Sequence, residues 1–147
     1  MEKSCKIASL YIASLKAMAL IYQNNHWLTR GETFYGDHLL FERLYKSTLE
    51  NLDSAAEKFV GLFGDSCLDY DLQVDLLHKA LLKYKHLEGS PAQMSLAIEE
   101  DFLKFSKEAY DIFEEDDKLS LGLDDMICAI SSQREESVYL LKQVLKD

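Results

Sequence analysis

The sequence has little proline, glycine or cysteine, and each scarcity excludes a class of fold. One proline and six glycines in 147 residues are too few turn residues for an all-β sandwich, and they favour long helices. The three cysteines, Cys5, Cys67 and Cys128, are widely spaced and form no CxxC or Cys/His zinc pattern. We therefore expect ordinary thiols rather than a disulfide framework, and a cytoplasmic location where thiols stay reduced.

Positive charge and long hydrophobic runs are also scarce. Lys and Arg number 16 against 26 Asp and Glu, so the net charge is −10. Proteins that bind nucleic acid through phosphate contacts normally carry an excess of positive charge. Lys3 and Lys6 are the only N-terminal cations besides the amino group. DNA binding is therefore not expected. The apolar stretch 7–22 is short and contains Lys16. We interpret it as an amphipathic core helix rather than a signal peptide or a membrane span.

The sequence is rich in apolar residues at helical spacing. Hydrophobic residues make up 48% of the chain, enough for a buried core in a single domain spanning 1–147. The spacing predicts four long helices and, inside the connection 65–89, a shorter one. The long helices are expected at about 3–27, 37–64, 90–117 and 124–145. This order predicts an all-α, ferritin-like four-helix bundle with a short extra helix in the crossover between helices 2 and 3.

The expected helix ends rest on turn and capping residues. Asp37 is the expected N-cap of the second helix, and Gly64 is expected to end it. Ser90 followed by Pro91 is expected to open the third helix, because proline suits the first helical position. Gly122 marks the expected break before the last helix.

Two of the four histidines flank one turn and are the first candidates for a metal site. His26 ends the first predicted helix and His38 begins the second, so folding can bring their rings together. Imidazoles suit iron, zinc or copper. The alternative is a capping histidine and an interface histidine without metal. Asp53 and Glu57 add two carboxylates on adjacent turns of the second helix.

The candidate ligands of the second helix share one side of it. At roughly 100° per residue, a stripe about 100° wide contains His38, Glu42, Asp53 and Glu57. His38 and Asp53 are about 22 Å apart along the helix axis, so they cannot bind one ion within one chain. If two copies of this helix pack antiparallel about a two-fold axis, His38 of one chain meets the carboxylates of the other, and the dimer holds two equivalent sites. Such a mixed N/O donor set suits redox-active iron.

A motif in this region resembles a known family. The pattern His26-Trp27-(x)3-Gly31-(x)2-Phe34-(x)3-His38, followed by Asp53-(x)3-Glu57, is similar to the ferroxidase-centre signature of the Dps family, the mini-ferritins. Residues 25–64 carry most of the resemblance, and 134–141 match the closing helix of that family more weakly.

The resemblance implies a hollow dodecamer, built from two-fold dimers, that protects against oxidative damage. It would oxidise Fe(II) with hydrogen peroxide or oxygen and store the ferric product inside. His26 and His38 would be catalytic metal ligands from one subunit, and Asp53 and Glu57 ligands from the other. Zinc and manganese stay open in place of iron. Trp27 would lie beside the centre, either as a packing residue or as a trap for oxidising equivalents.

Three further acids and one alternative function complete the predictions. Glu42 could lead iron away from the site, or be a plain interface acid. By the resemblance, Asp124 and Asp125 lie where the family has an acidic pore; both would also favour the dipole of their own helix.

The alternative function is a catalytically inactive ferritin-like shell, or a helical interaction protein without iron turnover. The intact set of four ligands favours the ferroxidase.

Overall fold

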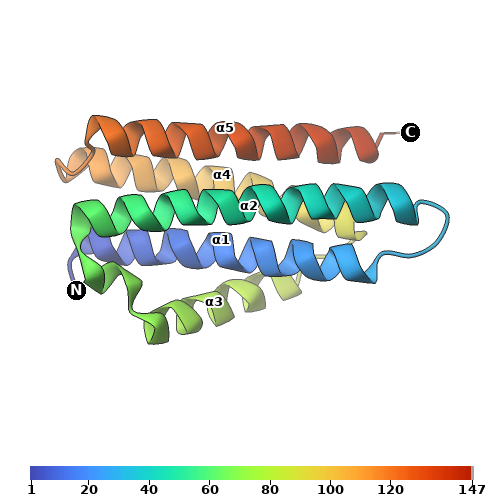
Figure 1. The fold of residues 1–147 in the computed structure, drawn as a ribbon, viewed down its shortest axis with the longest axis horizontal. Coiled ribbons are helices and arrows are strands. Elements are labelled where there is room, and N and C mark those ends of the chain that lie inside the picture. Colours follow the sequence, from blue (N-terminus) through green and yellow to red (C-terminus); the bar gives the residue numbers. More distant parts are fainter. Residues whose placement is uncertain (147) are drawn as a thin grey trace.

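The computed structural model describes residues 1–146 and is helical throughout, with no strand in that range (Figure 1). Its elements are α1 (Lys3–Leu28), α2 (Phe34–Phe63), the 3-10 helix η1 (Asp65–Leu68), α3 (Tyr70–Lys85), α4 (Pro91–Glu115) and α5 (Leu121–Val144). Helices α1, α2, α4 and α5 form the bundle, and α3 is the extra helix of the crossover. The predicted all-α, ferritin-like architecture is confirmed.

Helix α1 lies between α2 and α3 and supplies much of the core (Figure 1). By length and composition it could cross a membrane, but 67% of its most apolar window is buried inside the bundle. The ring of Tyr11 on α1 makes edge contacts with Phe59 of α2, at 5.5 Å, and Phe102 of α4, at 5.1 Å between centroids. These contacts bury large apolar surfaces at the centre of the bundle, where burial contributes most to stability. The apolar stretch 7–22 is therefore part of a core helix, as predicted.

The start of α4 follows the prediction from its capping residues. Ser90 Oγ accepts a hydrogen bond from the backbone N–H of Gln93, and the Gln93 side chain accepts one from the N–H of Ser90. With Pro91 in the first turn, this capping box leaves few backbone donors without a partner. The end of α2 at Gly64, with a φ of 93°, is also as predicted.

Two other helix starts differ from the prediction. Helix α2 begins at Phe34, and Asp37 lies inside it, where its carboxylate accepts a hydrogen bond from the Thr33 hydroxyl. Helix α5 begins at Leu121, because Ser120 Oγ accepts from the N–H of Leu123 and caps the helix before Gly122 is reached. At α5 the hydroxyl of Ser120 sets the helix start, whereas Thr33 at the start of α2 makes no capping hydrogen bond through its side chain.

A buried ion pair joins all four helices of the bundle. Arg134 of α5 donates to Glu99 of α4 at 3.1 Å, and both side chains are fully buried. Tyr22 of α1 donates its hydroxyl to the same carboxylate at 2.9 Å, and Arg134 also donates to the hydroxyls of Ser47 and Thr48 on α2. Burial raises the pKa of Glu99 to about 7, although the charge of Arg134 and the hydrogen bond from Tyr22 act in the opposite direction.

The expectation of three ordinary thiols is wrong for Cys5 and Cys67. Their sulfurs form a disulfide, with the two Cα atoms 4.8 Å apart and the two positions separated by 62 in the sequence. It ties the first turn of α1 to η1, at the end of the bundle opposite the α1–α2 turn. Only Cys128 is free in the described chain, and it is exposed.

Candidate metal centre

The two predicted histidines form a stacked pair at the junction of α1 and α2. His26 lies in the last turn of α1 and His38 in the second turn of α2. Their ring centroids are 3.7 Å apart, with 19° between the ring planes. The structure therefore brings together the two residues that the sequence placed on either side of one turn.

Each ring of this pair is oriented by the backbone of the other helix. Nδ1 of His26 lies 2.7 Å from the carbonyl oxygen of His38, and Nδ1 of His38 lies 2.7 Å from the carbonyl oxygen of His26. A carbonyl only accepts, so both Nδ1 atoms carry the proton. In the neutral ring the lone pair is then on Nε2, as a metal ligand requires. The carbonyl of His26 belongs to the last turn of α1, where backbone carbonyls lack a partner within the helix. The hydrogen bond from Nδ1 of His38 supplies that partner.

Aromatic side chains surround the histidine pair. The ring of Tyr45 meets His26 edge-on at 5.4 Å, and Phe34 stacks on His38 at 5.1 Å. Trp27 follows His26 directly and is 63% exposed in the single chain, so its own subunit does not bury it. The contact between Tyr45 and His26 was not predicted, because the two residues lie on different helices and no sequence pattern links them.

Asp53 and Glu57 are both exposed on α2, one turn apart. Neither makes a salt bridge within residues 1–146. Glu57 borders a shallow cavity of about 470 Å³ between α2 and the start of α5. The two carboxylates are therefore accessible and carry no counter-ion from their own chain.

The four predicted ligands do not converge within one chain. Across residues 1–146, no three His, Cys, Asp or Glu side chains lie close enough together to hold a metal ion. This agrees with the spacing of about 22 Å between His38 and Asp53 along one helix. The histidine pair and the carboxylate pair are two separated halves of a donor set.

Glu42 lies near the histidine half of this set. Lys46, one turn along α2, donates to its carboxylate at 2.6 Å. This hydrogen bond and the charge of Lys46 lower the pKa of Glu42, and the two histidines act in the same direction. Glu42 is thus an ionised acid next to the pair, although it is already paired with a lysine.

The two predicted pore acids lie at the start of α5, apart from the candidate ligands. Asp124 accepts hydrogen bonds from the Tyr110 hydroxyl at 3.3 Å and from the Cys128 thiol at 3.2 Å. The hydrogen bond to Asp124 raises the pKa of Cys128. Asp125 is exposed. Within one chain Asp124 is held by local contacts, while Asp125 projects into solvent.

An apolar groove between α1 and α2 was not predicted as part of the site. It has a volume of about 300 Å³ and includes Leu20 of α1 and Tyr45 and Leu49 of α2. Leu20 and Leu49 are both large hydrophobic side chains left exposed. At roughly 100° per residue, Leu49 falls between His38 and Glu42 around α2, inside the ligand stripe. Exposed leucines between two sets of polar ligands were the signal that could have revealed this surface.

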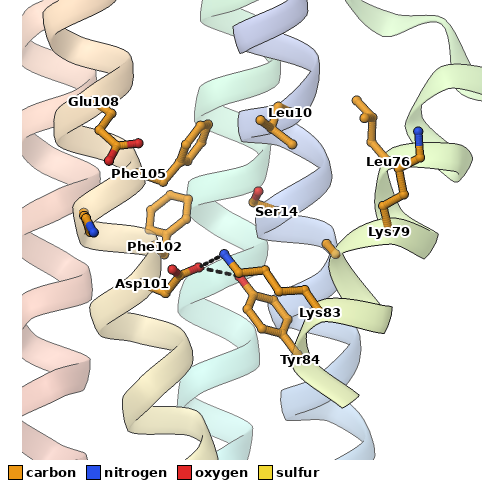
Figure 2. A pocket seen from close by; sticks show the side chains of 12 residues that line it. Leu10, Ser14, Leu76, Lys79, Lys83, Tyr84, Asp101, Phe102, Phe105 and Glu108 are labelled. Atoms are coloured by element: carbon orange, nitrogen blue, oxygen red, sulfur yellow. Dashed lines mark hydrogen bonds and ion pairs between the residues drawn. The ribbon is translucent and has the colours of Figure 1, made fainter. Parts of the chain in front are cut away.

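A second cavity, between α1, α3 and α4, holds none of the predicted site residues. Its volume is about 430 Å³, and Figure 2 shows Phe102 and Phe105 on one side and Lys79 and Lys83 on the other. Lys83 pairs with Asp101 at 2.7 Å and closes one end of the cavity. The candidate metal chemistry is therefore confined to the α1–α2 side of the bundle.

Known proteins resemble this chain over nearly its whole length. It is 26% identical to General stress protein 20U of Bacillus subtilis (strain 168) over 147 aligned residues, 98% of each chain. It is also 26% identical to a DNA protection during starvation protein of Brevibacillus brevis, over 92% of this chain and 89% of that protein. No protein-family model matches the sequence.

Solved structures show the same fold. The X-ray structure of Dps from Thermosynechococcus elongatus matches with a TM-score of 0.82 and 21% identity, covering 99% of this chain and 92% of the other. A Dps protein from Vibrio cholerae O1, described as a member of a broad superfamily of ferritin-like diiron-carboxylate proteins, matches with a TM-score of 0.79 and 17% identity, covering 98% and 89%. Together with the full-length sequence relatives, these structures show that the chain has the ferritin-like fold of Dps proteins.

Proposed function

We propose that the protein is a ferroxidase that oxidises Fe(II) at sites shared between two subunits and stores the ferric product inside a homo-oligomeric shell. The observation that carries the proposal is the split donor set. At one end of the α2 stripe, the backbone contacts of His26 and His38 use Nδ1 and leave Nε2 for a metal. At the other end, Asp53 and Glu57 are exposed and make no salt bridge within residues 1–146. Only a second copy of the chain can bring the two halves together.

An antiparallel pairing of two α2 helices would do this. The midpoint between His38 and the carboxylates falls near residue 47, so a two-fold axis there places each histidine pair opposite the partner's carboxylate pair. Leu49 lies close to that point, and Leu20 of α1 lines the same groove. Burying these exposed leucines against a second copy provides the apolar contact that such a dimer needs.

The donor chemistry suits the oxidation of Fe(II) as a substrate. Two imidazoles and two carboxylates hold the ion with open positions for an oxidant. Glu57 is the strongest single anchor and the best placed to contact two ions. Two Fe(II) ions supply the two electrons that convert hydrogen peroxide, with two protons, to two waters. Paired delivery avoids release of a hydroxyl radical and so protects other molecules in the cell.

The acidic character of the chain fits the entry and storage of iron. The simplest closed shell would be a dodecamer. In it, acids at the start of α5, where Asp125 is exposed, would line a passage for iron. Their negative charge would raise the local Fe(II) concentration. Glu42, ionised beside the histidine pair, would lead ferric ions away from the site. The net charge of −10 opposes phosphate contacts, so the proposal includes no DNA binding. A cytoplasmic location stays part of the proposal on the family resemblance alone.

Iron oxidation by the metal-stripped protein tests this function. A few Fe(II) ions per subunit are added without oxygen, and the ferric absorbance is followed after a pulse of peroxide or, separately, of oxygen. We expect oxidation much faster than in buffer and a soluble, protein-bound ferric product. Oxidation at the buffer rate, with iron precipitating outside the protein, would refute the ferroxidase and leave an inactive shell as the function.

Mixed oligomers test whether the ligands come from two chains. A variant with His38→Ala and a variant with Asp53→Ala are each expected to lack activity. When they are dissociated, mixed and reassembled, a hybrid dimer has one site with both defects and one site with neither. We therefore expect oxidation to recover to up to about half the wild-type rate per hybrid dimer. Verified hybrids, identified by mass spectrometry, that show no recovery would contradict a shared site.

A further inference from the structure

The proposed ferroxidase does not use the cysteine pair at the other end of the bundle. Cys5 lies in the first turn of α1, and Cys67 lies in η1, directly after α2. The Ser9 hydroxyl donates to the carbonyl of Cys67 at 3.1 Å and holds η1 against α1. The segment is thus positioned by contacts other than the disulfide, so the two sulfurs stay close to one another when the bond is open.

The two cysteines differ in their surroundings. Both cysteines are buried, with Cys5 4% exposed and Cys67 fully enclosed, so Cys5 lies nearer to the surface of the two. Cys5 also lies in the first turn of α1, where the helix dipole favours negative charge. Its sulfur also lies 3.5 Å from the Ser66 hydroxyl, a potential hydrogen-bond donor. These differences favour Cys5 as the nucleophile and Cys67 as the partner that resolves its oxidised form.

We propose that Cys5 and Cys67 form a dithiol that reduces hydrogen peroxide without iron and closes to the disulfide in doing so. The Cys5 thiolate attacks one peroxide oxygen, and the O–O bond breaks to give Cys5 sulfenic acid and hydroxide. The hydroxide takes up the proton that the Cys5 thiol lost on ionisation and becomes water. The Cys67 thiol then attacks the sulfenic sulfur, forming the S–S bond and releasing a second water. Two thiols give up two electrons and two protons, and one peroxide takes them up to form two waters.

The bond closes a covalent ring around the part of the chain that carries the candidate metal ligands. All of α1 beyond Cys5 and all of α2 lie between the two cysteines, so His26, His38, Asp53 and Glu57 are inside the ring. A ring of this size strongly restricts the unfolded chain. Oxidation by peroxide therefore stabilises the α1–α2 hairpin under the conditions in which iron oxidation is needed.

The test uses the full-length, metal-stripped protein in the presence of a chelator, so it does not depend on the iron site. The protein is reduced, freed of reductant and given one equivalent of hydrogen peroxide. In a Cys128→Ser background, we expect two titratable thiols per chain to fall to none. The oxidised protein should melt about 10 °C above the reduced protein. Retention of both thiols, or equal melting temperatures, would overturn the proposal.

Single variants test the order of the two steps. With Cys67→Ser in the same background, peroxide should leave a sulfenic acid on Cys5 that dimedone labels. With Cys5→Ser, the buried Cys67 should stay unlabelled in the folded protein. Cys128 of the wild type is an internal comparison, because the hydrogen bond to Asp124 raises its pKa and should slow its reaction. Labelling of Cys67 in the absence of Cys5 would contradict the assigned roles.

Discussion

Replacement of both carboxylates, Asp53→Ala with Glu57→Ala, is expected to reduce Fe(II) oxidation to the rate of buffer while leaving the fold intact. The two side chains are exposed and make no salt bridge within the described chain, so removing them costs little stability. The proposed site loses both of its anionic ligands, and two imidazoles alone hold Fe(II) too weakly for rapid turnover. Stopped-flow ferric absorbance and circular dichroism measure the two effects.

A matched double variant on another helix controls for the loss of two charges. Asp71 and Asp75 on α3 are exposed and have the same spacing of four residues. Replacing both with Ala removes the same charge but should leave the oxidation rate close to that of the wild type. If the variant at 53 and 57 oxidises iron as fast as this control, the inter-subunit site is wrong.

Glu99→Ala is expected to destabilise the bundle by about 3–5 kcal/mol, because it leaves the guanidinium of Arg134 buried without a counter-charge. The variant also removes the acceptor of the Tyr22 hydroxyl. Equilibrium unfolding in urea, compared at the same protein concentration, measures the change in free energy. A loss below about 1 kcal/mol would show that the pair is not isolated from water in solution.

Removal of both charges together is expected to cost much less than removal of one. Glu99→Gln with Arg134→Met keeps an acceptor for Tyr22 and fills a similar volume. Within residues 1–146, Glu99 Oε2 and Arg134 Nε have no hydrogen-bond partner, so the native pair is incompletely satisfied. Replacing such a pair with a neutral one is often neutral for stability. A double variant as unstable as Glu99→Ala would mean that packing, rather than the unpaired charge, causes the loss.

The sequence predicted those features that depend on neighbouring residues. Ser90 and Pro91 identified the start of α4 because a capping box is local, and the motif spacing placed His26 and His38 on one turn. The start of α2 was wrong because Asp37 lies inside the helix, where it accepts a hydrogen bond from Thr33 and does not cap. The start of α5 was wrong because Ser120 caps the helix before Gly122 is reached. Each error is therefore confined to a few residues at a helix end.

Contacts between distant positions were the part that the sequence could not show. The pairing of Cys5 with Cys67 joins positions 62 residues apart, and spacing contains no signal for it. The reciprocal bonds of the histidine rings depend on where two helices cross, and the burial of Glu99 with Arg134 depends on all four helices. Periodicity assigns residues to faces of helices, but only packing decides which faces meet.

The ring closed by Cys5 and Cys67 has a consequence for proteolysis. Residues 30–33, in the turn between α1 and α2, are exposed, and Arg30 offers a cleavage site for a trypsin-like enzyme. A cut there separates His26 and His38 onto two fragments, yet the disulfide still joins those fragments at the far end of the hairpin. The nicked chain stays one covalent molecule, and the stacked rings keep holding its cut ends together.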